Sequence, residues 1–372
     1  MKQLIISIII TAFLGTTQGC SQKTTNSQTA DNKVPSLCKA YEKYFPIGAA
    51  INPSMDLTSE ERMKFAAYHF NSITAENQFK PRYTHPKENL WRWEGADSII
   101  NFARKYKLKV RGHTLVWHQA TPDWMVKDGD KPASKELLLA RMKNHIETSM
   151  NRYKNDVYCW DVVNEAISED STKLDEIYRP TDPLYKILGE EYVAQAFIMA
   201  RAVDPKAQLF YNDFRFSDPI KRKKIYDLMK RMKDRGVPID GIGFQTHLVP
   251  DEETEAYLQE SIDMFSKLGL KVQITELDVS VYKFRDPKHP DADKSDTDYS
   301  EARKQKQSDM YDMVMRVCRR NAGKVTGVTF WGTSDARRNY RTIRIGKMDY
   351  PFVFDEFMQP KPVFYRIVNF KK

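Results

Sequence analysis

The chain is poor in cysteine, and the few cysteines it has form no recognisable site. Its 372 residues include four cysteines, of which Cys38, Cys159 and Cys318 lie far apart in the sequence. Such spacing matches neither a disulfide framework nor a zinc-binding motif. We therefore expect these three side chains to be small buried hydrophobic groups, and we expect no metal or other cofactor.

The chain also lacks a block of charge of one sign. It has 59 Lys and Arg against 50 Asp and Glu, a formal net charge of +9, and the basic residues are scattered. A positive balance favours polyanionic partners such as nucleic acid, anionic lipid or acidic polysaccharide. Because no nucleic-acid recognition motif accompanies the charge, we interpret it as a solvated surface and expect no nucleic-acid partner.

Long apolar runs are absent except near the start of the chain. Residues 4–14 are apolar, follow Lys2 and end shortly before Cys20. The run is too short to span a bilayer comfortably and is typical of a secretory signal. We expect a lipoprotein-type signal over 1–20 and a polar flexible tether over 21–36. The protein is then exported to the cell envelope and touches the membrane only through a lipid anchor at Cys20. Ordinary signal cleavage nearby, with loss of Cys20, is the alternative.

Apolar runs rich in β-branched residues alternate with amphipathic stretches over the remainder, 37–372. The pattern predicts parallel βα units, and eight strands are the number of a closed barrel. We therefore predict an α/β fold, a single (β/α)8 TIM-barrel catalytic domain. An open doubly wound sheet is the alternative, but the glycine-rich loop that such a sheet usually carries after its first strand is missing. The predicted strands are 47–50, 72–75, 110–115, 158–163, 208–211, 241–245, 272–275 and 326–330. The predicted helices are 59–70, 96–107, 134–153, 183–202, 219–235, 252–268, 299–320 and 362–370.

Polar side chains stand where these strands end, at the face on which a barrel carries its active site. A single such residue is more often structural, but a set from seven strands is costly to bury without a ligand. Carboxylates and amides suit sugar hydroxyls, and indole rings suit the C–H faces of sugars. The strand-end residues are Glu76, Asn77, His113, Trp117, His118, Asn164, Glu165, Tyr211, Asn212, Gln245, His247, Glu276, Asp278 and Trp331.

Two of these residues fit the chemistry of glycoside hydrolysis. Cleavage requires a proton donor for the departing oxygen and a carboxylate facing the anomeric carbon. Glu165 and Glu276 end the fourth and seventh strands, almost across the barrel from one another. We predict Glu165 as acid/base and Glu276 as nucleophile. A separation of about 5 Å implies retention of configuration, and one near 9 Å implies inversion.

The neighbouring residues are predicted to give the two carboxyl groups different characters. His247, with Asp278 behind it, is expected to keep Glu276 ionised through a hydrogen bond or positive charge. Repulsion from Glu276 and partial desolvation are expected to keep Glu165 protonated. Asn164 is expected to bind the 2-hydroxyl of the sugar being cleaved.

Seven segments resemble glycoside hydrolase family 10, the β-1,4-xylanases, over nearly all of 37–370. They are NSITAEN at 71–77, RGHTLVWH at 111–118, WDVVNEA at 160–166, YND at 211–213, GIGFQTH at 241–247, ITELD at 274–278 and TFWG at 329–332. The resemblance implies the barrel, the retaining mechanism and xylan or xylo-oligosaccharide as substrate. It implies that Glu76, Asn77 and Lys80 bind sugars on the non-reducing side. It places His113, Trp117, Gln245 and Trp331 around the sugar being cleaved, and Tyr211 towards the leaving group.

The chain departs from the family pattern at two positions. Pro81 follows Lys80 where the family usually has Trp, and Asn339 stands where a second Trp commonly covers the substrate. Close to Asn339 lie Arg337 and Arg338, which suggest a roomier, positively charged site for xylan with uronic-acid branches, because Arg pairs bidentately with carboxylates. The alternative is a solvated loop.

Two other functions remain open at the level of the sequence. A retaining glycosidase acting on another β-glycan would use the same carboxyl pair. A non-catalytic glycan-binding lipoprotein of an uptake system would be expected to have lost one of the carboxylates, and both are present.

Overall fold

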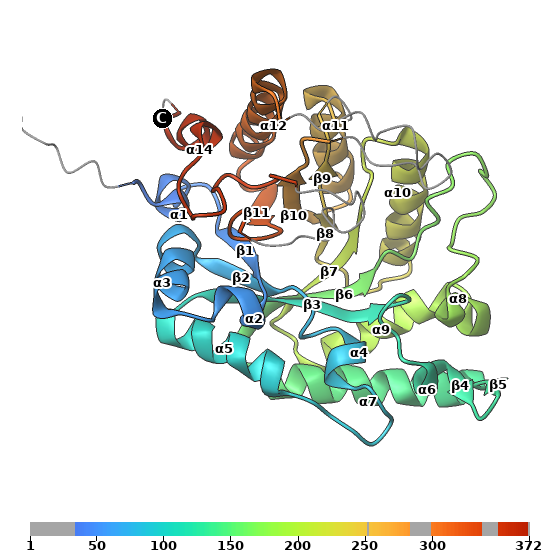
Figure 1. The fold of residues 1–372 in the computed structure, drawn as a ribbon. Helices are drawn as coiled ribbons and strands as arrows, with labels where there is room; N and C mark the ends of the chain where they lie inside the picture. Colours follow the sequence, from blue (N-terminus) through green and yellow to red (C-terminus); the bar gives the residue numbers. More distant parts are fainter. Residues whose placement is uncertain (1–33, 251–252, 283–298, 337–348, 371–372) are drawn as a thin grey trace, which may run out of the picture. The chain divides into compact units, whose positions relative to one another are not determined.

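The computed structural model describes residues 34–250, 253–282, 299–336 and 349–370 (Figure 1). The predicted signal over 1–20, most of the tether over 21–36, and Arg337 and Arg338 lie outside the described residues. No helix in the described part of the chain is long and apolar enough to cross a membrane.

Eight parallel strands form a closed barrel, which confirms the predicted fold and excludes the open sheet. The hydrogen-bonded order is β11, β1, β2, β3, β6, β7, β8, β10, and β10 pairs with β11 to close the ring. The strands are β1 Ile47–Ile51, β2 Ser72–Ala75, β3 Lys109–Trp117, β6 Val157–Asn164, β7 Gln208–Asp213, β8 Gly241–Phe244, β10 Lys271–Val279 and β11 Val325–Phe330. Each overlaps one predicted strand. The short strand β9, His247–Leu248, adds to β10 at the carboxyl end of the barrel.

Helices surround the strands as the amphipathic pattern predicted (Figure 1). The longer ones are α3 Glu60–His69, α5 Glu94–Tyr106, α7 Lys135–Tyr153, α9 Glu191–Val203, α10 Pro219–Asp234, α11 Glu255–Ser266 and α12 Glu301–Arg320. The shorter ones are α1 Leu37–Ala40, α2 Pro53–Asp56, α4 Pro81–Thr84, α6 Asp123–Val126, α8 Pro183–Leu188 and α14 Pro362–Val368. Several begin at side-chain caps: the Asp218 carboxylate accepts from two N–H groups of α10, and the Ser134 hydroxyl accepts from Leu137 N–H.

One predicted helix, over 183–202, is wrong in its continuity. The segment forms two helices, α8 and α9, separated at Gly189, whose φ is 62° and ψ is −153°. Residues with a Cβ rarely adopt this backbone conformation, and it cannot continue a helix. A two-stranded hairpin, β4 Lys127–Asp128 with β5 Lys131–Pro132, lies in the loop that follows β3 and was not predicted.

The interior of the barrel is polar as well as apolar. Arg111 on β3 forms a buried two-point ion pair with Asp161 on β6, and its Nε donates to Gln273 Oε1 on β10 at 2.9 Å. The side chains of Arg111 and Asp161 are 1% and 0% exposed. This bridge crosses the barrel beneath the carboxyl ends of the strands. The described cysteines, Cys38, Cys159 and Cys318, are free and buried, as predicted.

Candidate active site

Glu165 stands immediately after β6 in a conformation that places its carboxyl group over the barrel. Its φ is +56°, in the left-handed region that a residue with a side chain rarely occupies. Such a residue persists only where its surroundings hold it, and these conformations gather at functional sites. Here the N–H of Glu165 donates to the Asn212 carbonyl oxygen at 2.9 Å.

The Glu165 carboxyl group is buried and contacted on both oxygens. Gln245 Nε2 donates to Oε1 at 2.9 Å, and Trp117 Nε1 donates to Oε2 at 3.1 Å. Burial raises the pKa of Glu165, and the nearby negative charges of Asp213 and Glu276 act in the same direction. The hydrogen bond from Gln245 opposes this rise without reversing it. The environment therefore favours the protonated form that a general acid needs.

Glu276, on β10, has the opposite character. Asn212 Nδ2 donates to Oε1 at 2.9 Å, and His247 Nε2 lies 3.1 Å from Oε2. Burial acts to raise the pKa of Glu276. The hydrogen bond from His247 and the positive charges of His113, His247 and Lys80 outweigh it, so the pKa falls below its ordinary value. This carboxyl group is therefore held as the anion, as a nucleophile requires.

A relay of amide side chains connects the two carboxyl groups. Asn212 Nδ2 also donates to Asn164 Oδ1 at 2.9 Å, and Gln245 Nε2 lies 3.3 Å from the same oxygen. Thr275 Oγ1 donates to Asn212 Oδ1 at 2.7 Å, which fixes the orientation of the Asn212 amide. Asn212 was predicted to lie at a strand end, and no role was predicted for it. Its position within the YND segment, adjacent to a strand end, was the available signal.

His113 is held against the site by Asp161. His113 Nδ1 lies 2.9 Å from Asp161 Oδ2, the carboxylate that also binds Arg111. Trp331 packs beside His113 with ring centroids 5.4 Å apart and planes at 82°. Trp331 also lies 6.1 Å from the His247 ring. The structure thus brings together side chains from β3, β6, β9 and the end of β11 that lie far apart in the sequence.

The residues predicted to bind sugars on the non-reducing side lie after β2. Asn52 Nδ2 donates to Glu76 Oε2 at 2.8 Å, and Lys80 Nζ donates to Asn77 Oδ1 at 2.9 Å. Lys80 Nζ also lies 4.9 Å from the centroid of the Trp117 ring. Trp117 donates to Glu165, so the contact between Lys80 and Trp117 places Glu76, Asn77 and Lys80 on the side of the site next to Glu165.

Tyr211 is a predicted substrate-binding residue that the structure contradicts. Its side chain is fully buried, and its hydroxyl donates to Asp213 Oδ2 at 2.6 Å and accepts from Ala166 N–H at 3.1 Å. Successive strand residues point to opposite faces, so Tyr211 and Asp213 share the face opposite to Asn212. Tyr211 thus supports the backbone beside Glu165 and offers no surface to a ligand.

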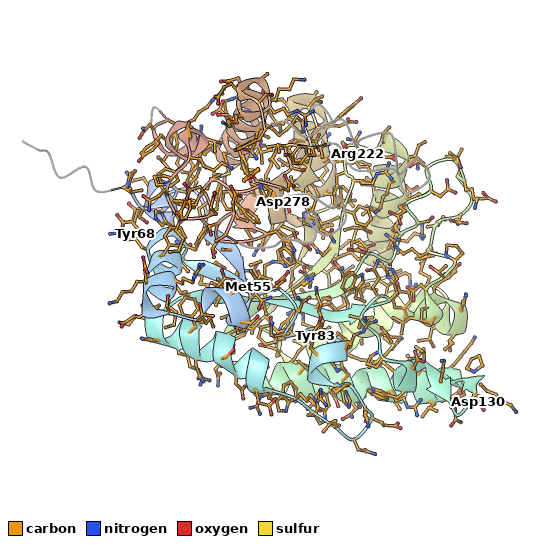
Figure 2. The ribbon with its side chains drawn as sticks, in the orientation of Figure 1. Met55, Tyr68, Tyr83, Asp130, Arg222 and Asp278 are labelled. Carbon is orange, nitrogen blue, oxygen red and sulfur yellow. The ribbon has the colours of Figure 1, made fainter. Side chains whose placement is uncertain are left out.

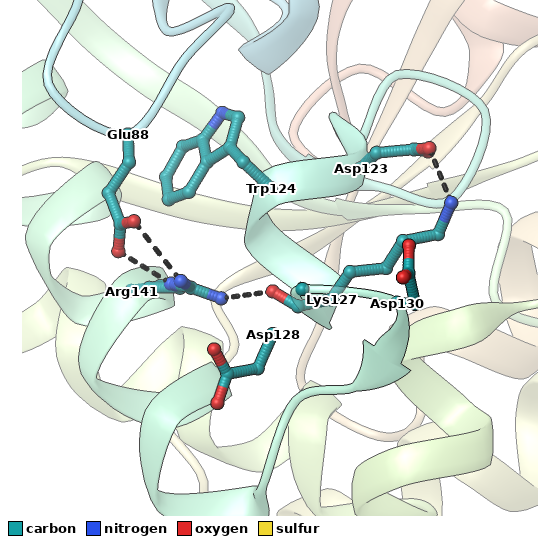
Figure 3. A pocket seen from close by; sticks show the side chains of 8 residues that line it. Glu88, Asp123, Trp124, Lys127, Asp128, Asp130 and Arg141 are labelled. Atoms are coloured by element: carbon teal, nitrogen blue, oxygen red, sulfur yellow. Dashed lines mark hydrogen bonds and ion pairs between the residues drawn. The ribbon is translucent and has the colours of Figure 1, made fainter.

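The structure also contains a hollow of about 550 Å³ beside the β4–β5 hairpin (Figure 3). Four of its charged groups are paired with one another: Arg141 binds both oxygens of Glu88 at 2.7 and 3.1 Å, and Lys127 binds Asp123 at 2.6 Å. Asp130, at the turn of the hairpin, lies far from Asp278 in the view of Figure 2. This hollow is therefore separate from the paired glutamates. No group of three or more His, Cys, Asp or Glu side chains in the described ranges is arranged to hold a metal.

Comparison with known proteins finds a matching family, similar sequences and similar solved structures. The model of the family described as "Glycosyl hydrolase family 10" matches residues 36–370. A "Beta-1,4-xylanase" of Dictyoglomus thermophilum is 43% identical over 346 residues, covering 91% of this chain and 92% of the relative. "Endo-1,4-beta-xylanase B" of Paenibacillus barcinonensis is 41% identical over 342 residues, covering 91% and 98%. Among solved structures, a xylanase from P. barcinonensis in complex with a conduramine derivative superposes with a TM-score of 0.84 at 40% identity, covering 91% of this chain and 99% of that one.

Proposed function

The chain belongs to glycosyl hydrolase family 10, and from this premise we propose that it is an endo-1,4-β-xylanase that cleaves xylan with retention of anomeric configuration. The observation that carries the proposal is the pair of buried glutamates with opposite protonation preferences. Glu165 is biased towards the acid and Glu276 towards the anion. The xylanases among its relatives support the choice of substrate.

In the first step, protonated Glu165 donates its proton to the glycosidic oxygen while the Glu276 carboxylate attacks the anomeric carbon. The bond to the leaving sugar breaks, and a glycosyl ester of Glu276 forms. In the second step, ionised Glu165 accepts a proton from water, which attacks the same carbon and releases the Glu276 carboxylate. Loss of the Glu276 charge after the first step removes one cause of the raised pKa of Glu165, so the acid becomes a base.

The surrounding residues have supporting roles in this proposal. Glu76, Asn77 and Lys80 bind sugars on the non-reducing side, and His113, Trp117, Gln245 and Trp331 surround the sugar being cleaved. Trp117 and Gln245 also donate to Glu165, so they orient the acid while they contact substrate. Asn164 offers its side-chain amide N–H groups to the 2-hydroxyl, because its Oδ1 already accepts from Asn212 and Gln245.

Sugar release tests the proposal. We expect the unmodified protein to release xylo-oligosaccharides from β-1,4-xylan, and Glu276→Gln to lose activity by at least about 10³-fold. Glu260→Gln, an exposed glutamate paired with Arg222, is the matched control and should retain parent activity. Product NMR at early times should show the β-anomer first. Release from other β-glycans alone would identify a different glycosidase, and no release from any glycan would identify a binding protein.

We also propose that the site accepts xylan bearing uronic-acid branches. Support comes from the sequence, where Arg337 and Arg338 accompany the replacement of a family Trp by Asn339. Arg337→Ala and Arg338→Ala should lower kcat/KM on glucuronoxylan and leave kcat/KM on undecorated xylan unchanged. If the ratio of kcat/KM on glucuronoxylan to kcat/KM on undecorated xylan were the same in the variants and the parent, the proposal would be wrong.

For location, we propose export followed by lipidation of Cys20. Support comes from Lys2, the apolar run over 4–14 and the polar stretch that follows Cys20. Metabolic labelling with a radioactive fatty acid should mark the parent protein, and Cys20→Ser should abolish the label. A soluble, unlabelled parent protein whose mature N-terminus lies after Cys20 would instead indicate ordinary signal cleavage.

A further inference from the structure

Arg179 is a buried cation placed against the main chain and side chain of Glu165. It lies at the end of a loop that leaves β6 and folds back: Ile167 and Tyr178 form an antiparallel bridge, and Arg179 N–H donates to the Ala166 carbonyl oxygen at 3.1 Å. Its Nε donates to the carbonyl oxygen of Glu165 at 2.9 Å. The side chain therefore fixes the peptide of a residue whose backbone is in the left-handed region.

The guanidinium group also has an unused donor near the acid/base. Nη2 of Arg179 is buried without a hydrogen-bond partner among the described residues, 4.0 Å from Glu165 Oε2. Nη1 is occupied by Glu169 Oε1 at 2.9 Å. A buried N–H without an acceptor is costly, so its persistence needs a reason. An ionised Glu165 supplies an acceptor that a protonated Glu165 supplies poorly.

We infer that Arg179 is a positioning residue for the second step of the reaction, in which Glu165 must be negatively charged. The inference rests on the proposed function. When water attacks the glycosyl ester, Glu165 takes one proton from it and the bond between Glu276 and the anomeric carbon breaks. Arg179 stabilises the ionised Glu165 before that proton arrives and holds the peptide of Glu165 in place throughout.

Other charged groups face Glu165, and their balance explains why a cation is needed there. Glu276 approaches from β10 and Asp213 from the end of β7, and both negative charges disfavour an ionised Glu165. Lys221 on α10 neutralises part of the Asp213 charge, since its Nζ lies 2.8 Å from Asp213 Oδ1. On the far side of Arg179, Glu169 binds the guanidinium, and His118 lies close enough to sense its charge. Among these groups Arg179 is the cation that contacts Glu165.

The experiment compares Arg179→Met, which removes the charge, with Arg179→Lys, which keeps it. A dinitrophenyl β-xylobioside needs no proton for its leaving group, so its kcat reports the second step, and the acidic limb of that kcat follows ionisation of Glu165. Without the positive charge of Arg179 nearby, the ionisation of Glu165 requires a higher pH. We expect Arg179→Met to move this limb to higher pH by about one unit. Added azide, which attacks without giving up a proton, should restore turnover below the limb and yield a glycosyl azide. Arg179→Lys should keep the limb at the parent position.

A merely structural role would lower kcat without moving the limb or responding to azide. The inference is overturned if folded Arg179→Met titrates like the parent, or if Arg179→Lys shifts by the same amount. If circular dichroism shows that Arg179→Met does not fold, Arg179→Gln takes its place, because it keeps an N–H donor without charge. The same measurement, the position of the acidic limb of kcat, then applies to Arg179→Gln. The Glu165→Ala variant distinguishes failure of the Arg179 inference from failure of the proposed function, because azide should restore its turnover if Glu165 is the acid/base. If azide does not restore Glu165→Ala, the assignment of Glu165 itself is wrong.

Discussion

His247 presents Nε2 to Oε2 of Glu276 at 3.1 Å. Its other ring nitrogen, Nδ1, lies 3.0 Å from Oδ2 of Asp278. An imidazole can donate to two carboxylates at once only when both nitrogens carry a proton, which makes the ring a cation. The arrangement therefore places a positive charge and a hydrogen-bond donor beside Glu276, which attacks as an anion in the proposed mechanism.

The pair of His247 and Glu276 gives the first prediction. The hydrogen bond and charge of His247 lower the pKa of Glu276, so their loss must raise it. Because kcat/KM requires ionised Glu276 in the free enzyme, its acidic limb should move to higher pH. We expect a shift of about one unit in His247→Ala and a smaller one in His247→Gln, which keeps a donor without charge. A pH profile of kcat/KM on xylotetraose measures it. Equal acidic limbs in all three proteins would contradict the role of His247.

Asn212 gives the second prediction. Its Nδ2 donates to both Glu276 Oε1 and Asn164 Oδ1, so Asn212→Asp turns a donor into a charged acceptor between two oxygens. We expect kcat/KM to fall by at least about tenfold, and the acidic limb to rise because two carboxylates share one site. The matched control is Asn71→Asp: Asn71 Oδ1 accepts from Ile47 N–H, and an aspartate keeps that acceptor. An Asn212→Asp variant with parent activity would exclude the relay from catalysis.

The eight strands and most helices could be predicted because periodic burial is a local property of the sequence. The convergence of Glu165 and Glu276 could be predicted because strand ends of a barrel meet on one face; their catalytic roles stay a prediction. The role of Asn212 could not, since its partners come from β6 and β10 and depend on strand register. Tyr211 was wrongly predicted to bind substrate. Successive strand residues point to opposite faces, so the residue next to Asn212 could have been predicted to point away from the ligand.

Arg179 could not be found from the sequence for a different reason. It is separated from Glu165 by a loop with no periodic pattern, and its approach depends on one antiparallel bridge and two hydrogen bonds to carbonyl oxygens. The break at Gly189 was missed because the apolar positions of α8 and α9 continue one helical pattern across it. In both places the backbone conformation decides the structure, and side-chain hydropathy carries little information about it.

The buried ion pair of Arg111 and Asp161 gives the third prediction. Removing one partner leaves an uncompensated buried charge, so Asp161→Asn and Arg111→Met should each lower the free energy of unfolding by about 3 to 5 kcal/mol. The double variant should cost less than the sum of the two. Urea unfolding at neutral pH measures all three. Strict additivity would mean that the pair does not act as a unit.

The same pair predicts how stability depends on pH. Burial acts to raise the pKa of Asp161, but Arg111 and His113 outweigh it and lower that pKa below its ordinary value. A lowered folded pKa stabilises the protein above the unfolded value of about 3.9. This contribution is lost as pH falls through the lower folded value. The parent should therefore lose stability more steeply in acid than Asp161→Asn, which has no carboxylate at this position to protonate.

Gly243 on β8 gives the last prediction, because it is the parallel partner of Asn212 on β7. A Cβ at Gly243 would lie 2.2 Å from Asn212 Oδ1 and 2.8 Å from Thr275 Cγ2, closer than any real contact. Gly243→Ala must therefore displace the amide that holds Glu276. Overpacking of this kind typically costs about 1 to 3 kcal/mol.

We expect Gly243→Ala to lower kcat/KM by at least about tenfold, since an error in position of about 1 Å can cost as much as 100-fold. Gly327→Ala on β11 is the control: its Cβ would meet the Gln273 side chain at 3.3 Å, so any displacement falls on the partner of Arg111 and not on Asn212. Activity and urea unfolding of both variants separate the two effects. If Gly243→Ala lost stability and kept its activity, Asn212 would be a structural bridge, and the orientation of Glu276 would have to depend on His247 alone.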